Sequence, residues 1–108
     1  MNDGSGYAVV MTTVASEEEA EELAAKILDR QLGACVQVLR IKSFYKWKGE
    51  TLRDSEWLLL IKTRAALYGE LEEFLRQNHG YETPEIIQLP VERGFSRYLG
   101  WIDENTRP

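Results

Sequence analysis

The sequence predicts an α+β fold with the element order β-α-β-β-α-β, and three features of the chain support it. The stretch 34–63 holds two long apolar and aromatic runs that meet at Gly49 without a proline in either, a pattern typical of a β-hairpin. One amphipathic helical stretch precedes this hairpin and another follows it. Short apolar runs lie outside both helices, so the six elements match the split βαβ, or ferredoxin-like, arrangement of an antiparallel sheet with both helices on one face.

The first strand and the first helix are predicted from the N-terminal third of the chain. The run 7–13 is rich in β-branched residues, as a buried strand is. Ser16 and Glu19 form a capping box that starts a helix. An apolar stripe at helical spacing follows, made of Ala20, Leu23, Ala24, Ile27 and Leu28. We expect Gly33 to end this helix, because a residue with positive φ after a helix is most easily glycine.

The second half of the chain contains two more strands and two more helices. The run 57–61 is apolar at every position, which indicates a central strand covered on both faces. The second main helix is predicted to end at Gly80. The run 85–89 then forms a short strand, and Pro90 indicates that this strand lies on an edge of the sheet or ends there. A short amphipathic helix over 96–105 completes the chain.

The hairpin is too long for the body of its own chain. Each arm of about 14 residues would reach roughly 45 Å, whereas a compact chain of this size has a diameter of about 34 Å. An overhanging two-stranded ribbon that carries Phe44, Tyr45 and Trp47 would be marginally stable alone. We therefore expect other copies of the same chain to cover the hairpin, with its aromatic residues packed against a neighbour.

Composition narrows the class of protein. The 108 residues suit one globular domain, 7–108, after a flexible N-terminus, 1–6. A net charge of -5 argues against nucleic-acid binding, and no apolar run is long enough to span a membrane. Cys35 is the single cysteine and therefore cannot form an internal disulfide. A single cysteine without a disulfide partner is typical of a protein in a reducing compartment, so we expect a cytoplasmic protein.

Most motifs of catalysis are absent, and two residues leave alternatives open. The chain has no phosphate-binding glycine loop, no GxSxG elbow, no HExxH motif and no CxxC pair. Cys35 and His79 form a conceivable catalytic dyad, but a lone cysteine at the start of an apolar strand is more often a small core residue. Lys62, in an apolar strand, either extends to water or meets an anion at a subunit cleft.

The stretch 78–85 contains the candidate metal ligands. His79 is the only histidine, and a turn at Thr83-Pro84 leads from it to Glu85. An imidazole and a carboxylate are both ligands for divalent cations, so His79 and Glu85 are the predicted metal pair. The alternative is that His79 only caps the carbonyl groups at the end of the preceding helix.

Several segments, in this order along the chain, resemble the CutA family of divalent-cation tolerance proteins. They are Gly33-Ala-Cys-Val36, Ser43-Phe-Tyr-Lys-Trp-Lys-Gly49, Ile61-Lys-Thr63, His79-Gly-Tyr-Glu-Thr-Pro-Glu85 and Tyr98-Leu-Gly-Trp101. The resemblance covers Val9 to about Asn105. It implies a ferredoxin-like protomer in a tight homotrimer with interlocked hairpins, an architecture similar to that of PII signalling proteins, and a link to tolerance of copper and other divalent cations.

Two departures from the family pattern affect metal binding. Gly80 stands where family members usually have proline, so the turn depends on glycine's backbone freedom. Thr12 and Asn78 stand where some members carry a thiol and a second histidine, which would complete a copper site. Because threonine is a poor copper ligand, we expect only weak binding of a divalent cation, copper or zinc, at the predicted pair.

The resulting hypothesis is a cytoplasmic, homotrimeric binding or regulatory protein connected to divalent-cation tolerance. It is expected to be neither an enzyme nor a nucleic-acid or membrane binder, and no firmly held cofactor is expected. The alternative is a small hydrolase or transferase with its active site at a subunit cleft, built from Lys62, His79 and Glu85.

Overall fold

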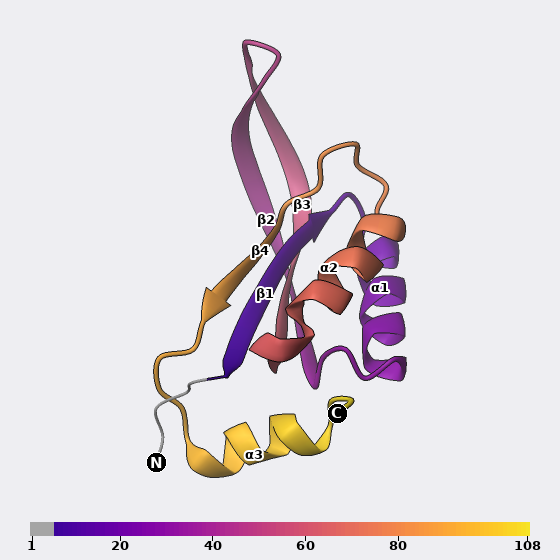
Figure 1. The fold of residues 1–108 in the computed structure, drawn as a ribbon. Coiled ribbons are helices and arrows are strands. Elements are labelled where there is room, and N and C mark those ends of the chain that lie inside the picture. Colours follow the sequence, from indigo (N-terminus) through magenta and orange to yellow (C-terminus); the bar gives the residue numbers. More distant parts are fainter. Residues whose placement is uncertain (1–5) are drawn as a thin grey trace.

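The computed structural model describes residues 6–108, and the segment 1–5, which the sequence predicts to be flexible together with Gly6, lies outside them. The described chain forms one sheet and its flanking helices (Figure 1). The elements are β1 (Tyr7–Val14), α1 (Glu17–Asp29), β2 (Cys35–Trp47), β3 (Glu50–Arg64), the 3-10 helix η1 (Ala65–Leu67), α2 (Tyr68–Gln77), β4 (Ile86–Pro90) and α3 (Ser96–Glu104). The strands are antiparallel in the order β2-β3-β1-β4, which confirms the predicted fold class and the edge position of β4.

The hydrophobic core lies between one face of the sheet and the helices α1 and α2. Val10, Leu59 and Ile61 point from the two central strands toward Ile27 of α1 and Leu71 of α2, and all five are fully buried. Each such side chain contributes roughly 1.5–3 kcal/mol through the apolar surface it removes from water. The predicted stripe of α1 is therefore confirmed at its centre, while its last member, Leu28, is 44% exposed.

No described helix of the main body covers the opposite face of the sheet. Side chains alternate along a strand, so Val9 and Met11 point away from α1 and α2 when Val10 is buried against them. The register partners of Met11, which are Leu60 on β3 and Ile87 on β4, continue this apolar surface. We call it the open sheet face; it comprises Val9, Met11, Leu39, Leu58, Leu60, Ile87 and Leu89.

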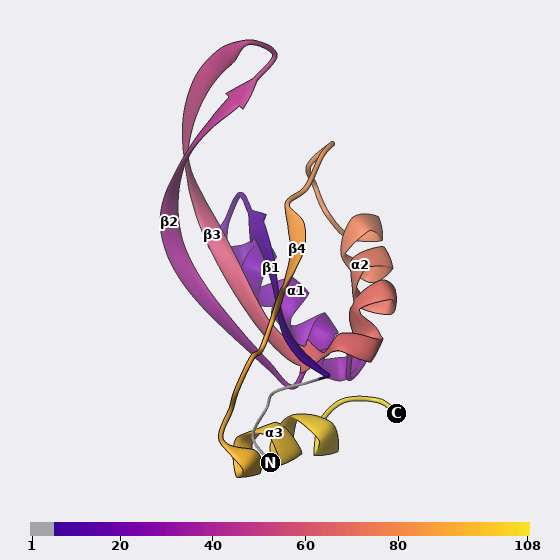
Figure 2. The ribbon, with the colours of Figure 1, turned by 60° about the vertical axis from the view of Figure 1, so that its left-hand side comes forward.

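The hairpin of β2 and β3 extends well beyond the rest of the sheet, as predicted (Figure 2). Val14, the last residue of β1, lies opposite Trp57. The register of the hairpin continues from there to Trp47 opposite Glu50, with no third strand beside it in the described chain. Lys48 and Gly49 have φ values of 51° and 84°, the left-handed pair of a type I′ turn. The described molecule consequently measures 46 × 26 × 22 Å along its principal axes.

Both helix ends differ from the prediction. The left-handed residue after α1 is Gln31, with a φ of 57°, rather than Gly33. The amides of Gln31 and Leu32 donate to the carbonyls of Leu28 and Ile27, the two bonds of a Schellman cap. Gly33 serves another purpose, because a Cβ there would lie 2.7 Å from Cγ2 of Ile61. The glycine thus allows the chain to pass close to the core face of β3.

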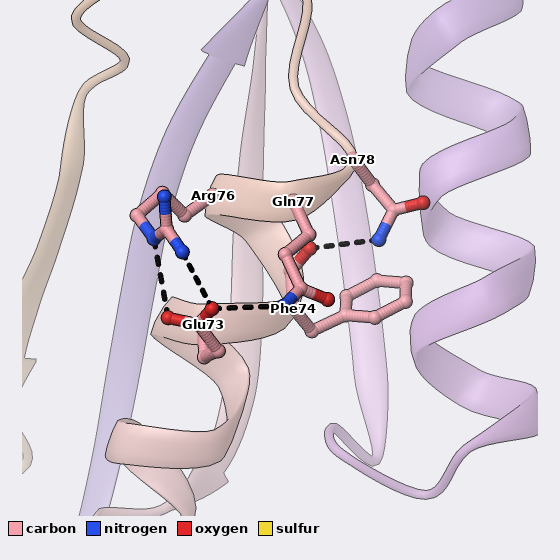
Figure 3. A network of polar contacts seen from close by, with 5 residues as sticks. All are labelled: Glu73, Phe74, Arg76, Gln77 and Asn78. Atoms are coloured by element: carbon pink, nitrogen blue, oxygen red, sulfur yellow. Dashed lines mark hydrogen bonds and ion pairs between the residues drawn. The ribbon is translucent and has the colours of Figure 1, made fainter.

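The second helix ends at Gln77, not at Gly80. Asn78 caps it, because its side-chain Nδ2 donates to the carbonyl of Phe74 over 2.9 Å (Figure 3). In the same turn Glu73 accepts hydrogen bonds from Arg76 and Gln77, a surface network of small energetic weight. Gly80 therefore belongs to the loop between α2 and β4 rather than to the helix end.

Candidate functional site

A groove separates the overhanging part of the hairpin from the loop that joins α2 to β4. Its volume is about 690 Å³, and we call it the hairpin groove. Hairpin residues line one side of it, and residues 80–83 and 85 line the other. The lining residues are Thr13, Ser43, Phe44, Tyr45, Trp47, Leu52, Asp54, Glu56, Gly80, Tyr81, Glu82, Thr83 and Glu85. The groove adjoins the open sheet face. Thr13, which lines the groove near the end of β1, is the register partner of Leu58, a residue of that face.

Glu56 and Tyr81 connect the two sides of the hairpin groove. The Tyr81 hydroxyl donates to Oε2 of Glu56 over 2.8 Å, across 25 residues of sequence. Glu56 is only 8% exposed. Burial, and then the hydrogen bond to Glu56 and the nearby negative charges, raise the pKa of Tyr81 far above its usual value. The phenol therefore stays protonated and holds the loop against β3.

A second phenol and carboxylate pair lies further along the hairpin. The Tyr45 hydroxyl donates to Oδ2 of Asp54. This hydrogen bond is the main reason that the pKa of the Tyr45 phenol is raised, with the charges of Asp54 and Glu56 acting in the same direction. The two tyrosines thus experience a negative electrostatic environment in the groove.

His79 lies beside the end of β1 and uses both of its ring nitrogens. Its Nδ1 accepts the backbone N–H of Tyr81 over 3.1 Å. Its Nε2 lies 2.7 Å from the carbonyl oxygen of Thr13 and, with Nδ1 as acceptor, carries the proton and donates. His79 therefore does not cap the carbonyls of α2, as the alternative interpretation held; it ties the loop to β1. The ring also lies 4.9 Å from that of Tyr81.

The predicted metal pair is split between two environments. Glu85 is exposed and lines the hairpin groove, whereas His79 is half-buried behind the loop and is not among the lining residues. Within residues 6–108, no group of three or more His, Cys, Asp and Glu side chains could hold a metal ion. A cation at His79 and Glu85 would have to recruit further ligands from water or from another copy of the chain.

The other candidate chemistry lies at the opposite end of the sheet. Cys35 is half-buried beside Lys62, whose register partner on β1 is Val9. His79 contacts Thr13, four residues along β1 and therefore about 13 Å away at roughly 3.3 Å per residue. One chain therefore does not bring Cys35 or Lys62 to His79.

Lys62 is half-buried and makes its side-chain hydrogen bond within the described chain. Its Nζ donates to Oε1 of Gln37 over 2.8 Å and lies 5.9 Å from the ring centre of Tyr98 on α3. Burial raises the pKa of the Tyr98 phenol, with the adjacent Cys35 thiol adding to the shift. These contacts hold α3 against the end of the sheet.

Thr12, which the resemblance to the family matches to a thiol in some members, is fully buried. Its hydroxyl is buried and has no hydrogen-bond partner among the described residues. We expect Thr12→Val to raise the free energy of unfolding by about 1 to 2 kcal/mol, because valine has the same shape without the unpaired hydroxyl. Chemical denaturation measures this.

Thr63 provides the matched control for that substitution. It is equally buried, but its hydroxyl donates to the carbonyl of Leu32 over 2.8 Å. Thr63→Val should therefore lower the free energy of unfolding by about 1 kcal/mol, the opposite sign. A loss of stability in Thr12→Val would mean that the Thr12 hydroxyl does have a partner.

The carboxylates of the groove other than Glu85 were not predicted. A signal existed for Glu56, because it directly precedes the apolar run 57–61 and points to the same face as Leu58 and Leu60. A charged residue at that position is unusual without a partner. Its partner, Tyr81, lies on a loop whose position relative to the hairpin only the folded chain defines.

The sheet order and the helices on one face define a protein of the ferredoxin-like α+β class, with a groove beside an extended hairpin. More particularly, the chain belongs to the family of the CutA1 divalent ion tolerance protein, whose model matches residues 8–105. The resemblance noted from the sequence motifs is thereby confirmed.

Individual relatives match at similar levels. The divalent-cation tolerance protein CutA of Archaeoglobus fulgidus is 39% identical over 95 residues, which cover 88% of this chain and 93% of that protein. Its counterpart from Thermus thermophilus is 41% identical over 99 residues, or 91% of this chain and 96% of that protein. The mouse protein CutA is 41% identical over 109 residues, but the matched region covers 95% of this chain and only 62% of the mouse protein.

Solved structures agree with the fold. The periplasmic divalent cation tolerance protein CutA from Archaeoglobus fulgidus superposes with a TM-score of 0.91 at 37% identity, covering 94% of this chain and 99% of that one. CutA1 from Oryza sativa gives a TM-score of 0.92 at 40% identity and 95% coverage of both chains. In the described part of this chain, none of the helices has the length and apolar character needed to cross a membrane.

Proposed function

We propose that this chain is a binding or regulatory protein of divalent-cation tolerance, acting in the cytoplasm as a homotrimer of PII-like architecture. The observation that supports it most directly is the family match over residues 8–105, with relatives that carry the name divalent-cation tolerance protein. The cytoplasmic location is proposed because Cys35 is the only cysteine and is free.

The open sheet face supports the assembly. It places Met11, Leu60 and Ile87 side by side on a surface that no described element covers. Contiguous apolar surface of this kind is typical of subunit interfaces. In a trimer, neighbouring copies would cover the open sheet face and support the overhanging hairpin. Assembly would thus remove the apolar surface of the face and of the hairpin from water.

The proposed cation site combines His79, Glu85 and groups from water or a neighbouring copy. Because Nδ1 of His79 carries the lone pair, a copper or zinc ion would bind there by displacing the amide of Tyr81. That lost hydrogen bond, together with only two protein ligands, limits the affinity to the micromolar range or weaker. Thr12 is not counted among its ligands, because its hydroxyl is fully buried and threonine is a poor copper ligand.

Calorimetric titration with copper and zinc tests the site. We expect weak binding to wild type, and its loss in His79→Ala and in Glu85→Ala. Glu92→Ala is the matched control, because Glu92 is an exposed carboxylate on the loop before α3 and should leave binding unchanged. Tight binding that survives both of the first two substitutions would place the site elsewhere and overturn the assignment.

A further inference from the structure

Positive charge gathers on one face of the hairpin. Side chains alternate along a strand, and Val36 of β2 and its register partner Ile61 of β3 belong to the side of the sheet that faces α1 and α2. The register then continues without a bulge to Trp47 opposite Glu50. Alternation along this register therefore places four cations on the helix side of the hairpin. They are Arg40, Lys42 and Lys46 of β2 and Arg53 of β3, and we call them the basic face.

The basic face contains no carboxylate that could neutralise it. All four cationic residues are exposed. Both ion pairs of the described residues lie elsewhere, at Arg76 and Arg107. The chain as a whole has a net charge of -5, so this concentration of positive charge is opposite in sign to the total. The other residues on this side of the described hairpin, from 38 to 46 and from 51 to 57, are Val38, Phe44, Thr51, Ser55 and Trp57.

Two of the four cations lie against aromatic rings of the same face. The Arg40 guanidinium is 5.8 Å from the ring centre of Trp57, and the Arg53 guanidinium is 5.8 Å from that of Phe44. A ring attracts a cation through its quadrupole but does not cancel the charge. These contacts hold the two guanidinium groups in place while their N–H donors stay available for bidentate pairing with carboxylates.

The basic face is the side of the hairpin that the proposed trimer leaves in solvent. The opposite side is the one that continues the open sheet face, and its β2 residues are Leu39, Ile41, Tyr45 and Trp47. That apolar and aromatic side suits contact with a neighbouring copy. Burial of four like charges without a carboxylate among them would instead be costly. Each trimer would therefore present three basic faces outward.

The spacing of the cations fits an extended acidic peptide. Arg40 and Lys42 are two residues apart on one strand, or about 7 Å, and the distance from Arg40 to Lys46 is about 20 Å. Alternate side chains of an extended peptide have the same spacing, so one carboxylate can meet each cation in a charge-assisted hydrogen bond. A long polyanion such as a nucleic acid would run beyond this short face onto a molecule of net negative charge.

We propose that the basic face binds an extended segment of a partner protein that carries Asp or Glu at alternate positions. Arg40 and Arg53 take carboxylates through their planar guanidinium groups, whereas Lys42 and Lys46 act as point charges. This interaction goes beyond divalent-cation tolerance. It uses neither His79 nor Glu85, so it does not depend on the proposed cation site.

Fluorescence anisotropy of dye-labelled decaglutamate, titrated with the assembled full-length protein, tests the proposal. The repulsion between its own charges keeps this peptide extended. We expect saturable binding that weakens as salt is added. The double variant Lys42→Glu with Lys46→Glu should bind roughly tenfold more weakly or worse, because two attractive pairs become repulsive. Both lysines are exposed, so the fold should tolerate the change.

The single variant Lys42→Glu has a matched control in Lys26→Glu. Lys26 is an exposed lysine on α1, and its substitution changes the net charge by the same amount. It should leave decaglutamate binding unchanged. Equal weakening by the two single variants would show a response to total charge alone and overturn the proposal, as would the absence of decaglutamate binding.

Two further results would assign the basic face to another occupant. Tighter binding of a ten-nucleotide single-stranded DNA than of decaglutamate would make the partner a nucleic acid. A loss of self-association in the double variant, seen by sedimentation, would place a second copy of the chain on this face. Copper titration of the double variant, expected to match wild type, separates failure of this interaction from failure of the cation site.

Discussion

Replacing Leu60 with glutamate is expected to separate the native assembly into single chains. Leu60 lies near the middle of the open sheet face, between Met11 on β1 and Gln37 on β2. In the proposed trimer this position is repeated three times around the interface. A carboxylate there exchanges apolar burial for an unpaired charge, which costs roughly 2 kcal/mol or more per copy.

Sedimentation velocity of wild type and variant at micromolar concentration measures this effect. Leu28→Glu is the matched control, because Leu28 is an exposed leucine on α1, away from the open sheet face. It should leave the assembly intact. A wild-type protein that sediments as a folded single chain would contradict the prediction and the trimer together.

Replacing Leu59, the neighbouring residue on the opposite face of β3, is expected to act on folding. Leu59 is fully buried in the core formed with α1 and α2. Leu59→Ala removes apolar contacts and leaves a cavity that the close-packed surroundings fill only in part. The free energy of unfolding should fall by roughly 2 to 5 kcal/mol.

Denaturant unfolding at one fixed protein concentration checks this value, since unfolding of an oligomer depends on concentration. Leu28→Ala is again the control, and a change within about 0.5 kcal/mol is expected for a surface position of this kind. A small effect of Leu59→Ala would mean that the core repacks around the missing side chain. The adjacent residues Leu59 and Leu60 thus distinguish the folding face of the sheet from the proposed assembly face.

Local pattern was sufficient to predict the elements of this fold. The apolar and aromatic content and the length of the runs around Gly49 predicted a hairpin that overhangs the sheet, and the structure extends it to Trp47 opposite Glu50. The capping box at Ser16 likewise predicted the start of α1, where the Ser16 side chain accepts the amide of Glu19. These features depend on residues close together in the sequence, so their physical causes can be read from a short window.

Helix ends were predicted less well, because local preference competed with packing. Gly33 has the conformational freedom to end α1, but its missing side chain is needed where the chain passes Ile61. Gln31 therefore adopts the left-handed conformation, and the Schellman hydrogen bonds stabilise it there. The sequence window around the helix contains no information about the position of Ile61, which comes from a strand almost thirty residues further along.

The sequence by itself determined the strands, the helices, the overhanging hairpin and the family resemblance, all of which follow from local periodicity and short motifs. The tertiary structure alone decided the site. His79 could be recognised as a candidate, but its two hydrogen bonds to Tyr81 and Thr13 depend on where the loop meets the end of β1. The groove with Glu56 against Tyr81 arises in the same way, because contacts between distant segments depend on the packing of the whole sheet and not on the residues beside them in the chain.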